Sequence, residues 1–222
     1  RTPLTGILPL LGKSFQTIDS YVRRLNETDD SSQAPAATDH IRAEAQRATC
    51  LTWGTMLISS TPKLMVSNFD VATVLDEVLD LYEAGNDLFN VSLAKDVQDR
   101  CSLRSDRRLV FVAIRGALDT ILPLAWRSRP EEVALRLSRD IPSRSVIFRV
   151  AQSVDRPPDS AWNRWFDLDW RERPGGICSG VGLLAAKRVA DLLGGALSIV
   201  PNQGPGCLLS LSFSETTTAR AE

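Results

Sequence analysis

Apolar residues recur at steps of three and four along the first part of the chain, which is the spacing of one helix face. These positions are Ile7, Leu11, Phe15, Ile18, Val22 and Leu25. They predict a long helix over residues 4–25, and the polar, turn-rich stretch over 26–38 predicts a loop. A second helical pattern starts at Thr38 or Asp39 and stops before Pro62, because proline cannot donate to the helix ladder. Two helices joined by one loop predict an antiparallel hairpin.

The pattern changes after residue 65, where short runs typical of strands lie between helical ones. Helical spacing recurs over 71–82, 107–126 and 183–193, and strand patterns occur over 90–94, 133–138, 146–150, 197–200 and 208–213. Strands and helices do not alternate strictly, which predicts an α+β domain with one sheet covered on one face by helices. We therefore expect a helical hairpin over 1–64, an α/β domain over 65–215 and a tail over 216–222.

Composition excludes several classes of partner. The 222 residues are 43% hydrophobic, and 26 Lys and Arg residues balance 27 Asp and Glu residues, so we expect neither nucleic acid nor an anionic membrane as a partner. The four cysteines form no CxxC pair, which argues against a zinc site or a disulfide framework and for a cytoplasmic protein. No apolar run approaches the roughly 18 residues of a membrane span. The start at Arg1, without a methionine, suggests a fragment or a processed chain.

Three stretches, in this order, resemble the signature boxes of sensor histidine kinases. Arg1–Ile7 is similar to the end of the H box, whose phosphoacceptor histidine would precede Arg1 by three positions, and Asp106–Asp119 stands at the place of the N box. Ser179–Val189, with a glycine pair after it, resembles the G2 box and its helix. The resemblance implies a hairpin that pairs with a second copy in a four-helix bundle and docks a response-regulator receiver domain. It also implies an ATP-binding α/β sandwich that uses Mg²⁺.

The glycines of the G2-like stretch agree with phosphate binding on physical grounds. Ser179–Gly182 lies directly before the helical pattern, where backbone N–H groups and the helix dipole favour an anion and glycine permits close approach. By the resemblance, Gly180, Gly182 and Leu183 would contact the nucleotide. A glycine-rich turn that caps a core helix is the alternative interpretation.

The N-box-like helix departs from the family pattern. Alignment places Asp119 where the family has a magnesium-binding asparagine, and Arg115 at an earlier asparagine. A carboxylate can bind Mg²⁺, and Arg115 can offset its charge or bind phosphate. A plain ion pair across one helix turn is the alternative. Leu122 stands where the family usually has a polar residue.

The G1-like segment departs further. Asp155 matches the aspartate that holds the adenine amino group, but Pro157 and Asp159 occupy glycine positions and resist the tight loop. The aromatic residues that follow are Trp162, Trp165, Phe166 and Trp170. They either pack on a nucleotide or fill an apolar gap in a degenerate site, and both interpretations stay open.

Two functions therefore compete. In the first, the parent protein phosphorylates its own histidine with ATP and passes the phosphoryl group to a response regulator. In the second, a pseudokinase or phosphotransfer scaffold keeps the fold and the dimer but binds ATP weakly or not at all. The only histidine, His40, is interpreted as a polar residue near a helix start, with a substitute phosphoacceptor as the alternative.

Overall fold

The computed structural model of the chain describes residues 4–27, 34–84, 91–98, 101–126, 131–152, 164–166, 176–202 and 206–216. The helices of this part are α1 (Leu4–Glu27), α2 (Ala34–Ser59), α3 (Val71–Ala84), α4 (Arg107–Trp126) and α5 (Gly176–Leu192). The strands are β1 (Val66–Asp70), β2 (Val91–Val97), β3 (Ser102–Asp106), β4 (Glu131–Asp140), β5 (Ser145–Gln152), β6 (Leu197–Pro201) and β7 (Cys207–Ser214).

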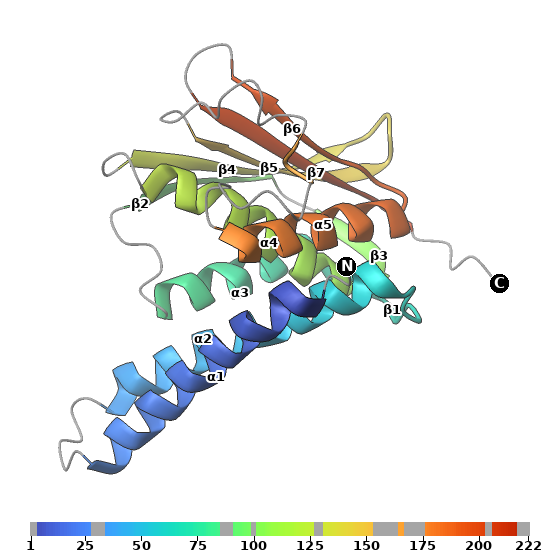
Figure 1. Ribbon diagram of the computed structural model, residues 1–222. Coiled ribbons are helices and arrows are strands. Elements are labelled where there is room, and N and C mark those ends of the chain that lie inside the picture. Colours follow the sequence, from blue (N-terminus) through green and yellow to red (C-terminus); the bar gives the residue numbers. More distant parts are fainter. Residues whose placement is uncertain are drawn as a thin grey trace.

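The first two helices form the predicted hairpin. Figure 1 shows α1 and α2 side by side and antiparallel, extending away from the rest of the molecule. The prediction of a loop up to residue 38 was wrong, because α2 already begins at Ala34. Pro35 is compatible with this start, since the first helical turn lacks N–H partners in any case. One chain supplies only two helices to such a hairpin, so a four-helix bundle requires a second copy.

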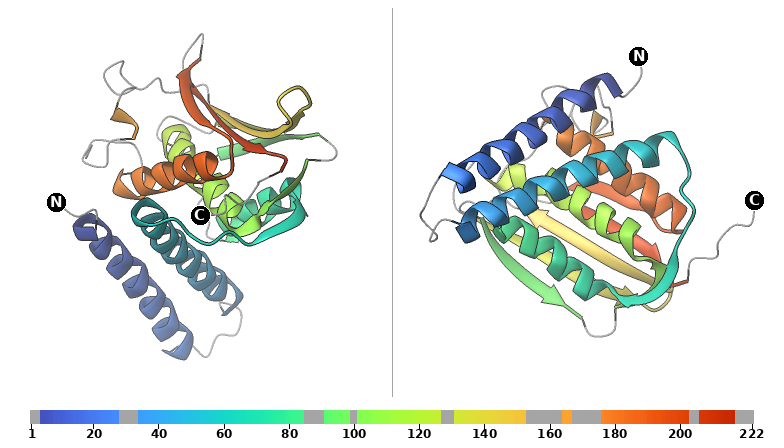
Figure 2. Two further views of the ribbon diagram at one scale, coloured as in Figure 1. Left: turned by 90° about the vertical axis from the view of Figure 1, so that its right-hand side faces the viewer. Right: turned by 90° about the horizontal axis from the view of Figure 1, so that it is seen from below.

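A mixed sheet forms the second layer, in the strand order β2-β4-β5-β7-β6. The β2–β4 pair is parallel and the other neighbours are antiparallel. Figure 2 shows α3, α4 and α5 across one face of this sheet, which confirms the predicted arrangement. All five strands predicted from the sequence are present.

A second, two-stranded sheet was not predicted. In it, β1 pairs antiparallel with β3, and Val66 lies opposite Asp106. The β1 residues are polar or only half-buried at most positions, so they lack the strict apolar alternation by which strands are recognised. The helices α3 and α4 follow these strands directly, so this small sheet fixes where both helices begin.

The hydrophobic core lies between the large sheet and the helices. Alternate residues of the three central strands face it, each at most 1% exposed: Val133, Leu135, Leu137, Val146, Phe148, Val150, Leu209, Leu211 and Phe213. Helix α4 contacts the sheet, α3, α5 and α2, so most of its surface is covered. Leu57 of α2 is 1% exposed and belongs to the same core, so α2 packs directly on the second layer. Within the described ranges, no helix is both long and apolar enough to cross a membrane.

Candidate functional site

The start of α4 is fixed by a buried carboxylate. Asp106 is 1% exposed, and its Oδ1 accepts a hydrogen bond from the Arg108 backbone amide at 3.1 Å, as in an N-cap. Its Oδ2 accepts the Met65 amide at 2.7 Å and the Arg108 guanidinium at 2.8 Å. Burial alone would raise the pKa of Asp106, but the hydrogen bonds and charge of Arg108 and the Met65 amide outweigh it, so this pKa is lowered.

The same arginine connects α4 to the helical hairpin. The Arg108 guanidinium lies 5.4 Å from the centre of the Trp53 ring on α2. Asp106 and Arg108 therefore tie together the first turn of α4, the segment before β1 and the last part of α2. We call these residues, with Met65 and Trp53, the α4 clasp.

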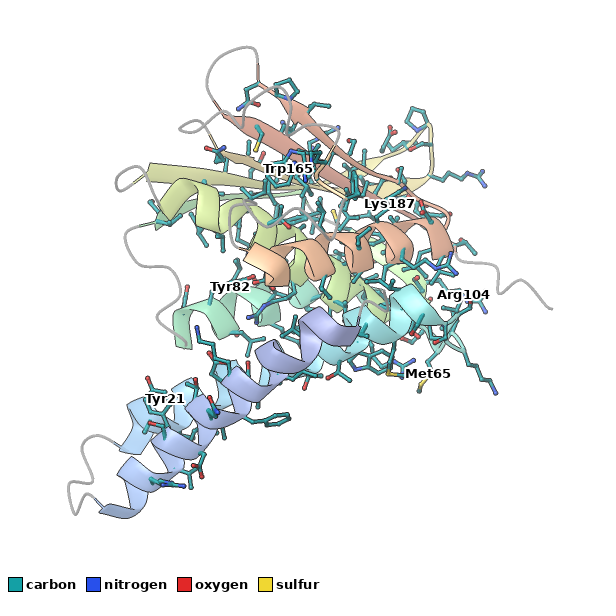
Figure 3. The ribbon with its side chains drawn as sticks, in the orientation of Figure 1. Tyr21, Met65, Tyr82, Arg104, Trp165 and Lys187 are labelled. Carbon is teal, nitrogen blue, oxygen red and sulfur yellow. The ribbon has the colours of Figure 1, made fainter. Side chains whose placement is uncertain are left out.

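About two and three turns beyond Arg108, respectively, Arg115 and Asp119 form a second cluster with Tyr82 of α3. The Arg115 Nε lies 3.4 Å from Asp119 Oδ1, and the Tyr82 hydroxyl donates to this same oxygen at 2.5 Å. The Arg115 guanidinium carbon lies 4.5 Å from the centre of the Tyr82 ring. Figure 3 shows Tyr82 where α3 meets α4. We call these three residues the α4 charge cluster.

Burial within the α4 charge cluster is uneven. The Arg115 side chain is 1% exposed and Tyr82 is 3% exposed, whereas the Asp119 side chain is 26% exposed. Arg115 and Asp119 are therefore brought together as the i, i+4 spacing predicts, with the cation inside and the carboxylate nearer the surface. Tyr82 was not predicted to take part, although a tyrosine in an apolar helix stripe signals a hydroxyl that needs a buried partner.

The glycines of the G2-like stretch lie inside a helix. The prediction that Ser179–Gly182 forms a loop was wrong, because α5 begins at Gly176. Only the first four N–H groups of a helix are free of intrahelical bonds, so the amides of Gly180 and Gly182 lie beyond them. Gly180 is buried.

Gly182 instead meets a glycine of α4. A Cβ added to Gly116 would lie 2.2 Å from the carbonyl oxygen of Gly182, and one added to Gly182 would lie 3.0 Å from the Gly116 Cα. The two helices thus cross with backbone against backbone. Gly116 was not singled out from the sequence, although a glycine in a helix interior, where it costs about 1 kcal/mol, signals a packing requirement.

The other predicted site residues are buried in the core or lie outside the described ranges. Leu183 is fully buried in the core, and Leu122 is 4% exposed. Asp155, with Pro157 and Asp159, lies outside the described residues, as does the side chain of His40.

One of the four aromatic residues of the predicted lid is part of the core. Trp165 is 1% exposed and is among the largest fully buried side chains (Figure 3). Phe166 packs against the core, and the Lys187 ammonium lies 6.0 Å from the centre of its ring. For Trp165 the geometry favours the gap-filling interpretation. Trp162 and Trp170 lie outside the described residues.

The magnesium site implied at Asp119 does not fit the residues around it. Mg²⁺ requires near-octahedral oxygen ligands, usually from one or two carboxylates and a phosphate. Here one carboxylate oxygen already accepts a hydrogen bond and faces a guanidinium. Among the described residues, no group of three or more His, Cys, Asp or Glu side chains is placed to hold a metal ion.

Comparison with known proteins identifies similar structures only. No profile of a known protein family and no curated sequence matches the chain. The histidine kinase AdeS of Acinetobacter baumannii matches with a TM-score of 0.59 and 14% identity, over 92% of this chain and 96% of that one. Full-length ShkA in complex with AMPPNP matches with a TM-score of 0.64 and 17% identity, over 99% of this chain and 47% of that one.

A third match contains a partner protein. The histidine kinase ThkA, in complex with the response regulator protein TrrA, matches with a TM-score of 0.60 and 14% identity, over 98% of this chain and 62% of that one. At such identities the similarity concerns the fold. The chain has the fold of the sensor histidine kinase core, hairpin and sheet domain together, and the predicted family resemblance is confirmed at the level of the fold.

Proposed function

We propose that this chain is the signalling core of a two-component sensor histidine kinase. The observation that carries the proposal is the fold match to ShkA, which extends over 99% of the chain and so includes the hairpin and the sheet domain in one order. In the parent protein such a core phosphorylates a histidine with ATP and transfers the phosphoryl group to a response regulator. A cytoplasmic location follows from this function.

The proposed domains are a hairpin over 1–64, an ATP-binding-type domain over 65–215 and a tail over 216–222. Their junction is packed: a Cβ on Gly54 of α2 would lie 2.9 Å from Val181 Cγ1 on α5. Movement of the hairpin would therefore be transmitted directly to α5 through this contact.

The hairpin is proposed to dimerise. Phe15 is 60% exposed and Val22 is 40% exposed, two turns apart on the apolar stripe of α1. A second copy would bury this stripe and complete a four-helix bundle. Sedimentation velocity should show a dimer that Phe15→Glu weakens, whereas Gln16→Glu, with the same charge change on an exposed neighbour, leaves it intact.

The proposed partner is the receiver domain of a response regulator. The support comes from ThkA, whose structure contains the response regulator protein TrrA and shares this fold over 98% of the present chain. The outer surface of the hairpin is the proposed docking surface.

The proposed ligand of the sheet domain is ATP, as the AMPPNP complex of ShkA suggests by analogy. The ATP-dependent function assigns nucleotide contacts to Arg115, Asp119, Asp155, Gly180, Gly182 and Leu183. The α4 charge cluster favours the second candidate function, a pseudokinase or scaffold with weak or no ATP binding. Its buried arginine and engaged carboxylate are unsuited to a triphosphate with its metal.

Calorimetric titration of the chain with ATP and MgCl₂ separates the two candidates. Binding that survives in Gly12→Ala, on the distant α1 helix, but is lost in an α4 or α5 variant supports the ATP-dependent function. Absence of binding at millimolar ATP contradicts it and leaves the signalling scaffold. A receiver domain that fails to bind the chain contradicts both.

A further inference from the structure

The α4 charge cluster already contains a cation where the resemblance implies Mg²⁺. Asp119 is the residue aligned with the metal-binding asparagine, and the Arg115 guanidinium lies 3.4 Å from its Oδ1. A guanidinium stays protonated in proteins, so this charge is permanent. The carboxylate therefore has a counter-ion within the chain.

Arg115 is held in this place by its surroundings. Its side chain is 1% exposed, its guanidinium lies over the Tyr82 ring at 4.5 Å, and its backbone is inside α4 next to the close contact between Gly116 and α5. A buried arginine cannot move to water without unpacking this region. Asp119 is thus the fixed partner of a fixed cation.

The hydrogen bond from Tyr82 adds to this arrangement. The Tyr82 hydroxyl donates to Asp119 Oδ1 at 2.5 Å and so occupies the oxygen that faces the arginine. A divalent cation at Asp119 would have to approach a permanent positive charge in a partly buried site, where Coulomb repulsion is weakly screened. Among the described residues, Asp119 also belongs to no group of three or more His, Cys, Asp or Glu side chains that could hold a metal ion.

We infer that Arg115 replaces the metal ion of this site, so that α4 holds no Mg²⁺ and Asp119 is the internal counter-ion of a buried guanidinium. This inference rests on the proposed function, since the resemblance gives Asp119 its place in the site. It makes any nucleotide binding by this chain independent of divalent metal.

Manganese(II) is a suitable probe because its free ion is measured directly by electron paramagnetic resonance, without nucleotide. We expect the wild-type chain and Asp119→Asn to bind Mn²⁺ equally weakly. Arg115→Met removes the internal cation at similar length, and Mn²⁺ affinity should rise at least ten-fold. The added Asp119→Asn change should abolish this gain, and Arg115→Lys, which keeps the charge, should show none.

Two results would overturn the inference: Mn²⁺ binding by the wild-type chain that Asp119→Asn removes, or a folded Arg115→Met chain that gains no Mn²⁺ affinity. If Arg115→Met does not fold, the comparison of the wild-type chain with Asp119→Asn still decides. Because the probe is the metal alone, failure of ATP binding affects the proposed function and leaves this result standing.

Discussion

An aspartate pairs with an arginine both at the start of α4 and in its middle, but the burial of the partners is reversed between the two pairs. At the α4 clasp, the Asp106 side chain is 1% exposed and Arg108 is 43% exposed. At the α4 charge cluster, Arg115 is 1% exposed and Asp119 is 26% exposed. Burial therefore removes water from the carboxylate in the first pair and from the guanidinium in the second.

The difference shows that the role of each ion pair depends on which of its two residues is buried. Buried Asp106 is satisfied by two backbone amides as well as by Arg108, so it serves as an anchor for the polypeptide around it. Buried Arg115 has Asp119 as its charged partner, so that carboxylate is committed to neutralising it. An aspartate at a ligand position in a sequence is available to a metal only when no neighbouring cation needs it.

The largest effect should follow when the buried arginine loses its counter-charge. Asp119→Ala should lower the free energy of unfolding by about 3 kcal/mol, because removing one partner of a buried ion pair is costly. Replacing both partners, as Arg115→Met with Asp119→Ala, should return stability to within about 1 kcal/mol of wild type. Urea unfolding of the wild-type chain, Asp119→Ala, Arg115→Met and the double variant measures the coupling energy between the two residues. Simple additivity of the two changes in stability would contradict this prediction.

At the other pair, loss of the carboxylate should cost less. Asp106→Ala removes an N-cap and the acceptor of the Met65 amide, each worth about 1 kcal/mol, for a loss of about 2 kcal/mol. Arg108 would be left largely in water, so its lost ion pair adds little. Asp96→Ala is the matched control, because this exposed aspartate pairs with Arg136 only at the surface, 3.2 Å away. An equal loss in both variants would refute the anchoring role.

A smaller effect is expected between the two pairs, where α4 meets α5. Gly116→Ala places a Cβ against the Gly182 carbonyl and should cost about 1 to 2 kcal/mol, because overpacking outweighs a gain in helix propensity of about 1 kcal/mol. Gly12→Ala on α1 has no atom within 4 Å of the new Cβ and should stabilise the chain. Thermal unfolding distinguishes the two, and a stabilising Gly116→Ala would show that the helices are free to separate.

Much of the architecture can be predicted from periodicity. The apolar spacing predicts a helix over 107–126, and α4 occupies Arg107–Trp126, because its pattern is long and begins directly after the capping Asp106. The start of α5 cannot be predicted in this way. Glycine opposes helix formation locally, and only the approach of α4 in three dimensions makes Gly182 favourable inside a helix.

The candidate site shows the same limit. Arg115 and Asp119 are one turn apart, so their contact is visible in the sequence. The third member, Tyr82, lies 37 residues from Asp119 along the chain, and its contact depends on how α3 packs beside α4. Whether Asp119 is a magnesium ligand or the partner of a buried arginine thus depends on tertiary packing, which one sequence without its fold does not specify.

The last prediction concerns the pH dependence of the stability that Asp106 contributes. The pKa of Asp106 is lowered in the folded chain, whereas an aspartate in an unfolded chain has a pKa of about 3.9. Between these values the unfolded chain binds more protons, so the stability that Asp106 contributes is complete above about pH 4 and is lost as pH falls through the folded pKa. Urea unfolding from neutral to acid pH should therefore show the gap between wild type and Asp106→Asn narrowing below about pH 4. The hydrogen bond from Arg139 also lowers the pKa of Glu215. Glu215 is present in both chains, so its contribution to the pH dependence cancels in the difference. A gap that stays constant into acid would mean that Asp106 titrates alike in both states, and that burying the carboxylate has no electrostatic consequence.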